Sequence, residues 1–264
     1  MIRLAVTLGI VVAVSSFAMG FSEDFESYGA GDAVAGVHGW IETGYGDWFE
    51  TNAVASGDPS FLGTRYADLG NNGHSNPTSG DARLAQVFGR TTSGILTVDF
   101  DVSFSLVGNL NSCNIFLCDS DRTPSSDVAL QGAAIFVGFV GLRVHDGDWQ
   151  TVDNFSVQND TWYHAWITVD LDDRTWQLAM AAYAGETLGA TTIVSYAGDD
   201  TFAFRDPGAA LDDIGMIEFA DSSAVMADSA GRGLYVDNVN VPEPATLSLL
   251  AAAGVLAIRR RIKA

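Results

Sequence analysis

The chain has 264 residues, of which 47% are hydrophobic and 17% are charged, and its formal net charge is −20 at pH 7. Its 33 acidic and 13 basic residues argue against nucleic acid and anionic lipid as partners, because the body of the protein repels both. The same balance favours solubility and binding of divalent cations, and adaptation to a high-salt habitat would also account for it.

Residues 1–20 have the order of a secretory signal peptide. Arg3 supplies a positive charge, residues 4–14 form an apolar run, and Ala18 and Gly20 are small residues suited to a cleavage site. We therefore expect export and a mature chain that begins at Phe21. A membrane anchor that is not cleaved is the alternative.

The segment between the two ends of the chain predicts one all-β domain, residues 21–240. The chain contains 28 glycines, and this segment has few helix-length patterns and many short alternating runs. Short aromatic strands are expected around Trp40 and Trp48, and residues 70–81 have the composition of a polar loop. Up to residue 241 the exported part holds 8 basic residues, all arginine, and 32 acidic residues, so its net charge is 8 − 32 = −24.

The clearest strand of the first half lies at residues 95–104. One face is apolar and the other is polar, with Leu96, Val98, Phe100, Val102 and Phe104 opposite Thr97, Asp99, Asp101 and Ser103. This period of two predicts a half-buried strand.

Cys113 and Cys118 are the two cysteines of the chain. Export permits a disulfide, but five positions of separation on one regular strand place the side chains on opposite faces. A bulge or tight turn between them would be needed to join them, so the sequence leaves the disulfide open. No second pair of ligands is spaced to complete a zinc site.

Buried strands at 133–150 turn at Asp146-Gly147, and a β-hairpin follows at residues 161–183. Its apolar face is predicted to carry Tyr163, Ala165, Ile167, Val169 and Leu171, and its other face Trp162, His164, Trp166, Thr168 and Asp170. Asp172-Asp173 begins the turn, and the return strand carries Trp176, Leu178 and Met180. Residues 214–221 and 233–241 supply the last two strands of the domain.

The hairpin and the two ends of the domain resemble the concanavalin A-like, laminin-G-like jelly rolls. The residues that carry this resemblance are Trp162 to Asp170, the return strand to Ala182, an opening strand at Phe25-Glu26 and the closing Tyr235 to Val239. The resemblance implies a single antiparallel β-sandwich whose first and last strands are adjacent.

Calcium is the cofactor that the sequence suggests. Asp24 and Glu26 share parity on the expected first strand, and Asp237 lies on the last strand, which the resemblance places alongside. Related carbohydrate-binding jelly rolls hold a structural calcium there, and calcium takes several carboxylate oxygens. The alternative is that all three are solvated carboxylates at the edge of a sheet.

A sugar-binding face is the second candidate site. Trp166 and His164 lie opposite the apolar stripe, and Trp48 or Trp149 could join them. Aromatic rings beside carboxylates and amides suit sugar recognition, although tryptophan next to a strand also serves in packing.

No catalytic residue is predicted, and we expect the protein not to be an enzyme. The carboxylates at 23–26 and 170–173 do not reproduce the E-x-D-x-E pattern of jelly-roll glycosidases. The four histidines show no metal-ligand spacing, and no G-x-S-x-G or phosphate-loop motif occurs. A glycoside hydrolase or lyase is therefore the weakest of the alternatives.

The last segment, residues 241–264, has three parts in a fixed order. Pro242, Glu243 and Pro244 form an extended spacer, residues 245–258 are uncharged, and Arg259, Arg260 and Arg261 begin a basic end. The uncharged run favours a transmembrane helix, but its fourteen residues rise only about 21 Å against a hydrocarbon core of roughly 30 Å. Such a short span suits a transient anchor.

This tail resembles the PEP-CTERM sorting signal. The resemblance implies recognition by an exosortase, which removes the tail and releases or re-attaches the protein outside the inner membrane. An ordinary tail anchor with a chance pair of prolines is the alternative. Together the two ends predict an exported protein of the cell surface or extracellular matrix. Its body is expected to be structural or associated with exopolysaccharide, with a lectin-like module as the alternative.

Overall fold

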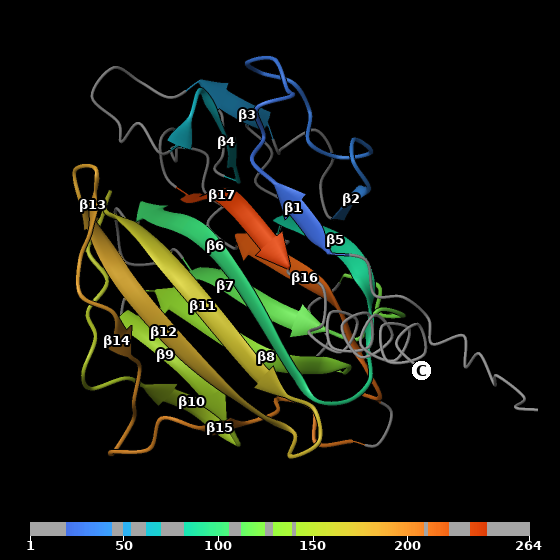
Figure 1. The fold of residues 1–264 in the computed structure, drawn as a ribbon, viewed down its shortest axis with the longest axis vertical. Coiled ribbons are helices and arrows are strands. Elements are labelled where there is room, and N and C mark those ends of the chain that lie inside the picture. The colour runs from blue at the N-terminus through green and yellow to red at the C-terminus, as the bar shows by residue number, and fades with distance from the viewer. Residues whose placement is uncertain are drawn as a thin grey trace, which may run out of the picture.

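The computed structural model describes residues 20–43, 50–53, 62–69, 82–105, 112–124, 129–138, 141–208, 211–221 and 233–241. These residues form two antiparallel β-sheets, one in front of the other in Figure 1. The described part contains no α-helix, and none of its segments is a helix that could cross a membrane. The predicted all-β sandwich is confirmed.

The ten-stranded sheet has the order β13-β12-β11-β6-β17-β4-β3 along its main path. Three short strands extend it, since β1 pairs with β17 while β14 and β15 pair with β12. Its strands are β1 (Phe21–Glu23), β3 (Glu50–Ala53), β4 (Arg65–Asp68), β6 (Ile95–Ser105), β11 (Trp162–Asp170), β12 (Thr175–Ala184), β13 (Thr187–Leu188), β14 (Thr192–Ile193), β15 (Phe202–Ala203) and β17 (Gly233–Val241).

The seven-stranded sheet has the order β10-β9-β8-β7-β16-β5-β2. Its strands are β2 (Trp40–Thr43), β5 (Ala82–Thr91), β7 (Ser112–Cys118), β8 (Gln131–Gly138), β9 (Gly141–Asp146), β10 (Asp148–Thr151) and β16 (Ile214–Asp221).

The core lies between the inner faces of the two sheets. On β6 the side chains of Leu96, Val98 and Phe100 are buried in it, as the alternation at residues 95–104 predicts. Across the core the Phe100 ring meets Phe219 of β16 edge-on, with centroids 5.5 Å apart. Each sheet thus has one inner face in the core and one outer face.

The hairpin of β11 and β12 also follows the prediction. Tyr163, Ala165, Ile167 and Val169 are buried in the core, while the alternate side chains are only partly buried. The turn occupies residues 171–174, and β12 returns along β11 in register from Thr175 opposite Asp170. The turn at Asp146-Gly147 is confirmed as well, because Gly147 joins β9 to β10 with a φ of 70° that favours glycine.

The first and last strands are adjacent, as the jelly-roll resemblance implies. Phe21 pairs with Val241 and Glu23 with Val239, and Figure 1 shows β1 alongside β17. The first strand is shorter than predicted, however. It ends at Glu23, and Phe25 has a left-handed φ of 55°, so the chain turns there. Asp24 and Glu26 therefore lie in a turn and not on a strand.

The two cysteines are free and buried. Both lie on β7, where Cys113 faces the main core and Cys118 belongs to a smaller apolar cluster on the outer face. Their side chains point to opposite sides of one strand, so the structure excludes a disulfide between them.

Several predictions concern residues outside the described ranges. These are the signal peptide up to residue 19, Trp48, the loop at 70–81 and the tail from Pro242, including Glu243, Pro244 and the arginines 259–261.

Candidate functional site

The outer face of the ten-stranded sheet gathers acidic, amide and aromatic side chains from β4, β6, β11, β12 and β17. We call it the acid–aromatic face. Its central rows follow from the register of β6 and β11. His164 lies opposite Asp101, Trp166 opposite Asp99, and Trp162 opposite Ser103. Both predicted ligand-binding residues, His164 and Trp166, are on this face.

Asp101 is the centre of a hydrogen-bond network. Its Oδ1 lies 2.7 Å from Nδ1 of His164 and accepts a bond of 3.0 Å from the Tyr183 hydroxyl, and its Oδ2 accepts one of 2.7 Å from Nδ2 of Asn238. The Asp101 side chain is 4% exposed and that of His164 is 16% exposed. The carboxylate is therefore fixed by three side chains at the base of the face. Burial and the charge of Asp101 raise the pKa of Tyr183, so its hydroxyl stays a donor.

Asp99 continues this network along β6. Its Oδ2 accepts a bond of 2.9 Å from Nδ2 of Asn240, and its Oδ1 lies 3.7 Å from Nε2 of His164. Burial raises the pKa of Asp99. The imidazole of His164 thus lies between two carboxylates, and its ring also meets the ring of Trp166 with centroids 4.2 Å apart. These contacts orient the two predicted ligand-binding side chains.

A β-bulge in β17 supplies the amides. Asp237 is opposite Asp101 and Asn240 is opposite Asp99, so β17 contains one residue more than β6 over this stretch. Asn238 takes the extra position with a left-handed φ of 48°, which asparagine tolerates better than most residues. The bulge places an additional polar side chain on the face.

Two more rings, Tyr66 and Tyr235, extend the face towards β4. Tyr66 meets Trp162 and Tyr235, with centroids 5.7 Å and 5.6 Å apart and interplanar angles of 70° in both pairs. All three side chains are partly exposed. The face therefore presents aromatic surface beside fixed hydrogen-bonding groups.

The sequence did not identify most of this face. Tyr183 has outward parity on the predicted return strand, and this signal could have found it. Tyr66 comes from β4, a strand that was not predicted. Trp149 does not join the face as expected, because it lies on β10 at the edge of the other sheet.

Asp237 is the most buried of the three proposed calcium ligands. It is 0% exposed, and its Oδ1 accepts a bond of 2.8 Å from the backbone N–H of Asn238. Its Oδ2 has no hydrogen-bond partner among the described residues. Burial, together with the negative charges of Asp101, Glu26 and Asp24, raises the pKa of Asp237 to about 9.

Asp24 and Glu26 are tied into the turn after β1. Asp24 accepts a bond of 3.1 Å from the backbone N–H of Glu26. The Glu26 carboxylate accepts bonds from the backbone and hydroxyl of Thr64 and from the backbone of Arg65, at 2.5, 2.6 and 3.0 Å. Burial acts to raise the pKa of Glu26, but these bonds outweigh it and lower the pKa. Together with burial, the negative charges of Asp24 and Glu26 raise the pKa of Asp237. The oxygens of the three carboxylates are nevertheless not within 4.8 Å of one another.

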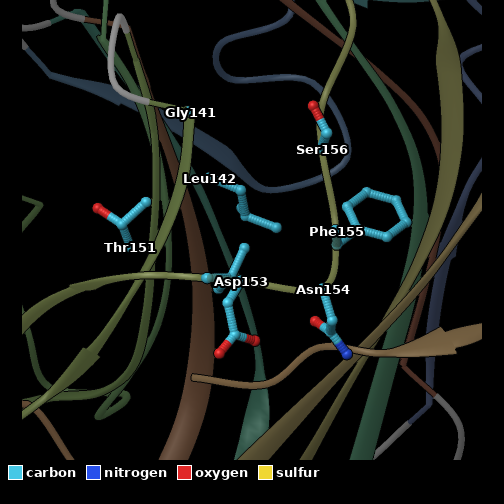
Figure 2. Close-up of a pocket in the computed structure, with 8 residues that line it drawn as sticks. Gly141, Leu142, Thr151, Asp153, Asn154, Phe155 and Ser156 are labelled. Carbon is cyan, nitrogen blue, oxygen red and sulfur yellow. The ribbon is translucent and has the colours of Figure 1, made fainter. Parts of the chain in front are cut away.

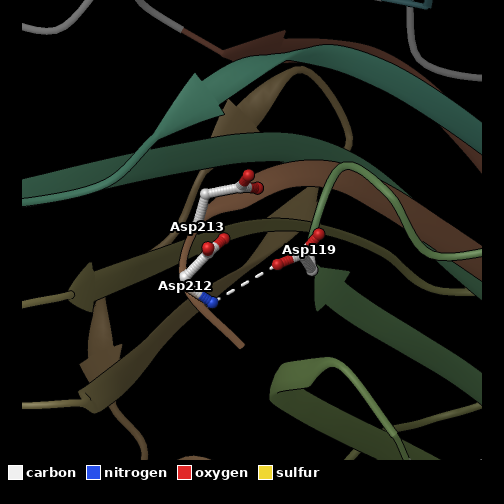
Figure 3. Close-up of side chains that lie close together, drawn as sticks. All are labelled: Asp119, Asp212 and Asp213. Carbon is white, nitrogen blue, oxygen red and sulfur yellow. Dashed lines mark hydrogen bonds between the residues drawn. The ribbon is translucent and has the colours of Figure 1, made fainter. Parts of the chain in front are cut away.

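A different acidic cluster does bring three carboxylates together. Asp119, Asp212 and Asp213 have oxygens within 4.8 Å of one another (Figure 3), so their donor set could hold a metal ion. Protein groups already engage them. Ser120 donates its backbone N–H and hydroxyl to Asp213, and Arg90 lies 2.9 Å from the same carboxylate.

A surface pocket of about 470 Å³ lies between β9, β10 and the segment that follows them (Figure 2). Two of its polar side chains, Asp153 and Asn154, are engaged with residues 193–197 of the neighbouring loop. These bonds of Asp153 and Asn154 hold the neighbouring loop in place.

Comparison with known families concerns the end of the chain. Residues 240–262 match the PEP-CTERM protein-sorting motif. The chain carries an exosortase sorting signal. The motif indicates an exported protein that is processed by an exosortase and sorted to the cell envelope. A search of curated protein sequences found no match.

Comparison with solved structures concerns the body. Lectin I-B4 of Griffonia simplicifolia, in its metal-free form, is similar with a TM-score of 0.51 and 10% identity, over 86% of this chain and 99% of the lectin. Lectin II of Ulex europaeus has a TM-score of 0.50 and 9% identity, over 86% of this chain and 98% of the lectin. These likenesses confirm the concanavalin A-like jelly-roll fold.

Proposed function

We propose that the exported body is a non-catalytic β-sandwich that associates with polysaccharide at the cell surface or in the extracellular matrix. The acid–aromatic face is the surface that contacts the sugar. This proposal joins a structural role in the matrix with lectin-like contact.

The observation that carries the proposal is the pairing of partly exposed rings with fixed polar groups on one face. Pyranose rings present C–H surfaces that stack on aromatic rings, and their hydroxyls bond to carboxylates and amides held in place. Trp162, Trp166 and Tyr235 offer the rings. Asp101 and Asn238 offer the fixed polar groups.

The carboxylates of the face favour recognition over catalysis. A retaining glycosidase needs a nucleophile and an acid that face each other across the scissile bond. Both oxygens of Asp101 instead accept hydrogen bonds from His164, Tyr183 and Asn238. Incubation of the protein with its glycan ligand should therefore release no new reducing ends, and a steady release would overturn the non-catalytic assignment.

We also propose calcium as a structural cofactor at Asp237, with Asp24 and Glu26 contributing. The support is the buried Oδ2 of Asp237, which has no partner among the described residues, and the mutual repulsion of the nearby carboxylates. A divalent cation would remove that repulsion and hold Asp237 ionised.

The sugar contact is tested by Trp162→Ala and Trp166→Ala in the full chain. Each variant should bind the exopolysaccharide of the host about threefold to tenfold more weakly in affinity electrophoresis, because a stacking surface is lost. Tyr196→Ala is the matched control, since Tyr196 is an exposed ring (38%) outside the face. Unchanged binding of both tryptophan variants, with native circular dichroism, would refute the proposed contact.

A further inference from the structure

The outer face of the seven-stranded sheet gathers half of the arginines of the exported body. Arg83, Arg122, Arg143 and Arg205 are four of its eight arginines. They lie among the rings of Phe116, Phe136 and Trp149. We call these seven residues the arginine face. The exported body has a net charge of 8 − 32 = −24, so four arginines on one face are a local concentration of positive charge in an acidic protein.

Aromatic rings hold two of the guanidinium groups in place. The Arg205 guanidinium carbon lies 5.4 Å from the ring centroid of Phe116 and 5.0 Å from that of Trp149. The same atom of Arg143 lies 5.7 Å from Phe136 and 6.0 Å from Trp149. Trp149 is therefore shared by both arginines, and stacking restricts the orientation of their planar forks.

Small side chains make room for this layer. Ala85, Ala134 and Ala220 are fully buried beneath it, in the same cluster as Phe116. Because their side chains are short, long arginines from the loops can lie flat over the strands. Arg205 is held there by backbone bonds from residues 205 and 206 to Gly132 and Gln131 of β8.

The four arginines differ in their partners. Glu218 pairs with both Arg83 and Arg122. Arg205 donates to the amide oxygen of Gln131 at 2.6 Å, and Arg143 donates to the backbone carbonyl of Trp149 at 2.9 Å. Within the described residues, the Nε atoms of Arg143 and Arg205 are buried and have no hydrogen-bond partner.

Together with burial, the positive charge of the arginines lowers the pKa values of groups beside them. Burial and repulsion by Arg122 and Arg83 lower the pKa of Arg205. Burial and the charge of Arg205 lower the pKa of His145, whose Nδ1 is also buried without a partner in the described structure. Asp146 and Asp148 flank His145 and oppose this effect. Each of them already accepts a backbone N–H, from Ala203 and Trp149 respectively.

We propose that the arginine face binds the carboxylate groups of an acidic polysaccharide, with Arg143 and Arg205 as the donors. A guanidinium fork matches a carboxylate in geometry and charge, and both side chains are partly exposed. The inference rests on the proposed function only in taking the ligand to be a polysaccharide, since it concerns the opposite side of the sandwich.

The test compares polygalacturonate with its fully methyl-esterified form, which has the same sugar backbone without the charge. The full chain should bind polygalacturonate and not the ester, and binding should weaken with salt. Arg143→Gln and Arg205→Gln should each weaken binding roughly tenfold to hundredfold. Arg90→Gln is the control, because it removes one positive charge outside the face and should leave binding unchanged.

A measurement on the unmodified protein covers the case in which a variant fails to fold. The Nε–Hε NMR signals of Arg143 and Arg205 should shift on titration with galacturonate oligomers, while those of Arg90 should not. Arg205→Lys, which keeps the charge and loses the fork, should still bind less tightly than the parent protein.

The outcomes separate this inference from the proposed function. Trp162→Ala and Trp166→Ala should retain full binding to polygalacturonate, because they lie on the other sheet. Equal binding of the methyl ester, or silent arginine signals, would overturn the inference. Binding of dextran sulfate without any binding of polygalacturonate would overturn the assignment to carboxylates.

Discussion

At the scale of single residues, Asp237 has an unusual environment for a carboxylate. It is buried beside three other acidic side chains, and only one of its oxygens has a partner among the described residues. The raised pKa of Asp237 means that, without a cation and between about pH 4 and pH 9, the native state retains a proton that the unfolded chain releases. Binding of calcium at Asp237 should therefore change how the free energy of unfolding depends on pH.

In the presence of a chelator, the free energy of unfolding should fall as the pH rises. The native pKa of Asp237 is about 9 against an ordinary value of 3.8, so between these values the native state binds more protons than the unfolded state. Asp237→Asn should flatten this slope and stabilise the chelated protein near pH 8. Urea unfolding across the pH range measures both effects.

Calcium supplies the control for this prediction. Added Ca²⁺ should raise the unfolding midpoint of the parent protein and have a much smaller effect on Asp237→Asn, because binding to the native state alone stabilises it. Identical pH slopes for the two proteins would show that Asp237 does not titrate in this range.

At the scale of elements, the hairpin of β11 and β12 connects the core to the acid–aromatic face. Ile167 is fully buried, while its neighbour Thr168 points outward and lies 3.3 Å from the hydroxyl of Thr97. One strand thus serves packing with one set of side chains and the outer surface with the other.

Ile167→Ala should lower the free energy of unfolding by about 2–5 kcal/mol, because it removes buried methyl groups and leaves a cavity. Thr168→Ala on the same strand should cost about 1 kcal/mol or less. Chemical denaturation of both variants measures the difference. Equal losses would mean that the assignment of faces on β11 is wrong.

The elements also show what a sequence can predict. Strict alternation identified β6, β11 and β12 together with their buried faces. The first strand was extended too far, because the left-handed backbone at Phe25 leaves no mark in an apolar pattern. The bulge at Asn238 adds a single residue, and periodicity over so short a strand does not reveal it.

The candidate site was less accessible to sequence reasoning than the fold. Parity assigns a side chain to one face of its own strand but does not say which sheet holds that strand, so the sequence left Trp149 open as a neighbour of Trp166. The arginine face was missed because its residues come from strands and loops that are far apart in the chain. Only the pairing of β5, β16, β7, β8, β9 and β10 in one sheet brings them together.

At the scale of the whole molecule, the sorting signal governs the fate of the chain. Replacing Pro242, Glu243 and Pro244 by alanine should stop processing and leave the full C-terminus in the membrane fraction. The parent protein released by its host should be truncated near residue 241. Intact mass of both proteins measures this, and an untruncated parent would identify the tail as a plain membrane anchor.

The pairing of β1 with β17 has a consequence for assembly outside the cell. Phe21, the first residue after the expected signal cleavage, pairs with Val241 in the antiparallel register of β1 and β17. Val241 is the last residue before the proline spacer. β17 also lies in the interior of its sheet, between β6 and β4. The ten-stranded sheet therefore cannot be completed until its last strand, β17, is available to pair. In the folded domain the first and last strands lie side by side, so the two ends of the described body are neighbours.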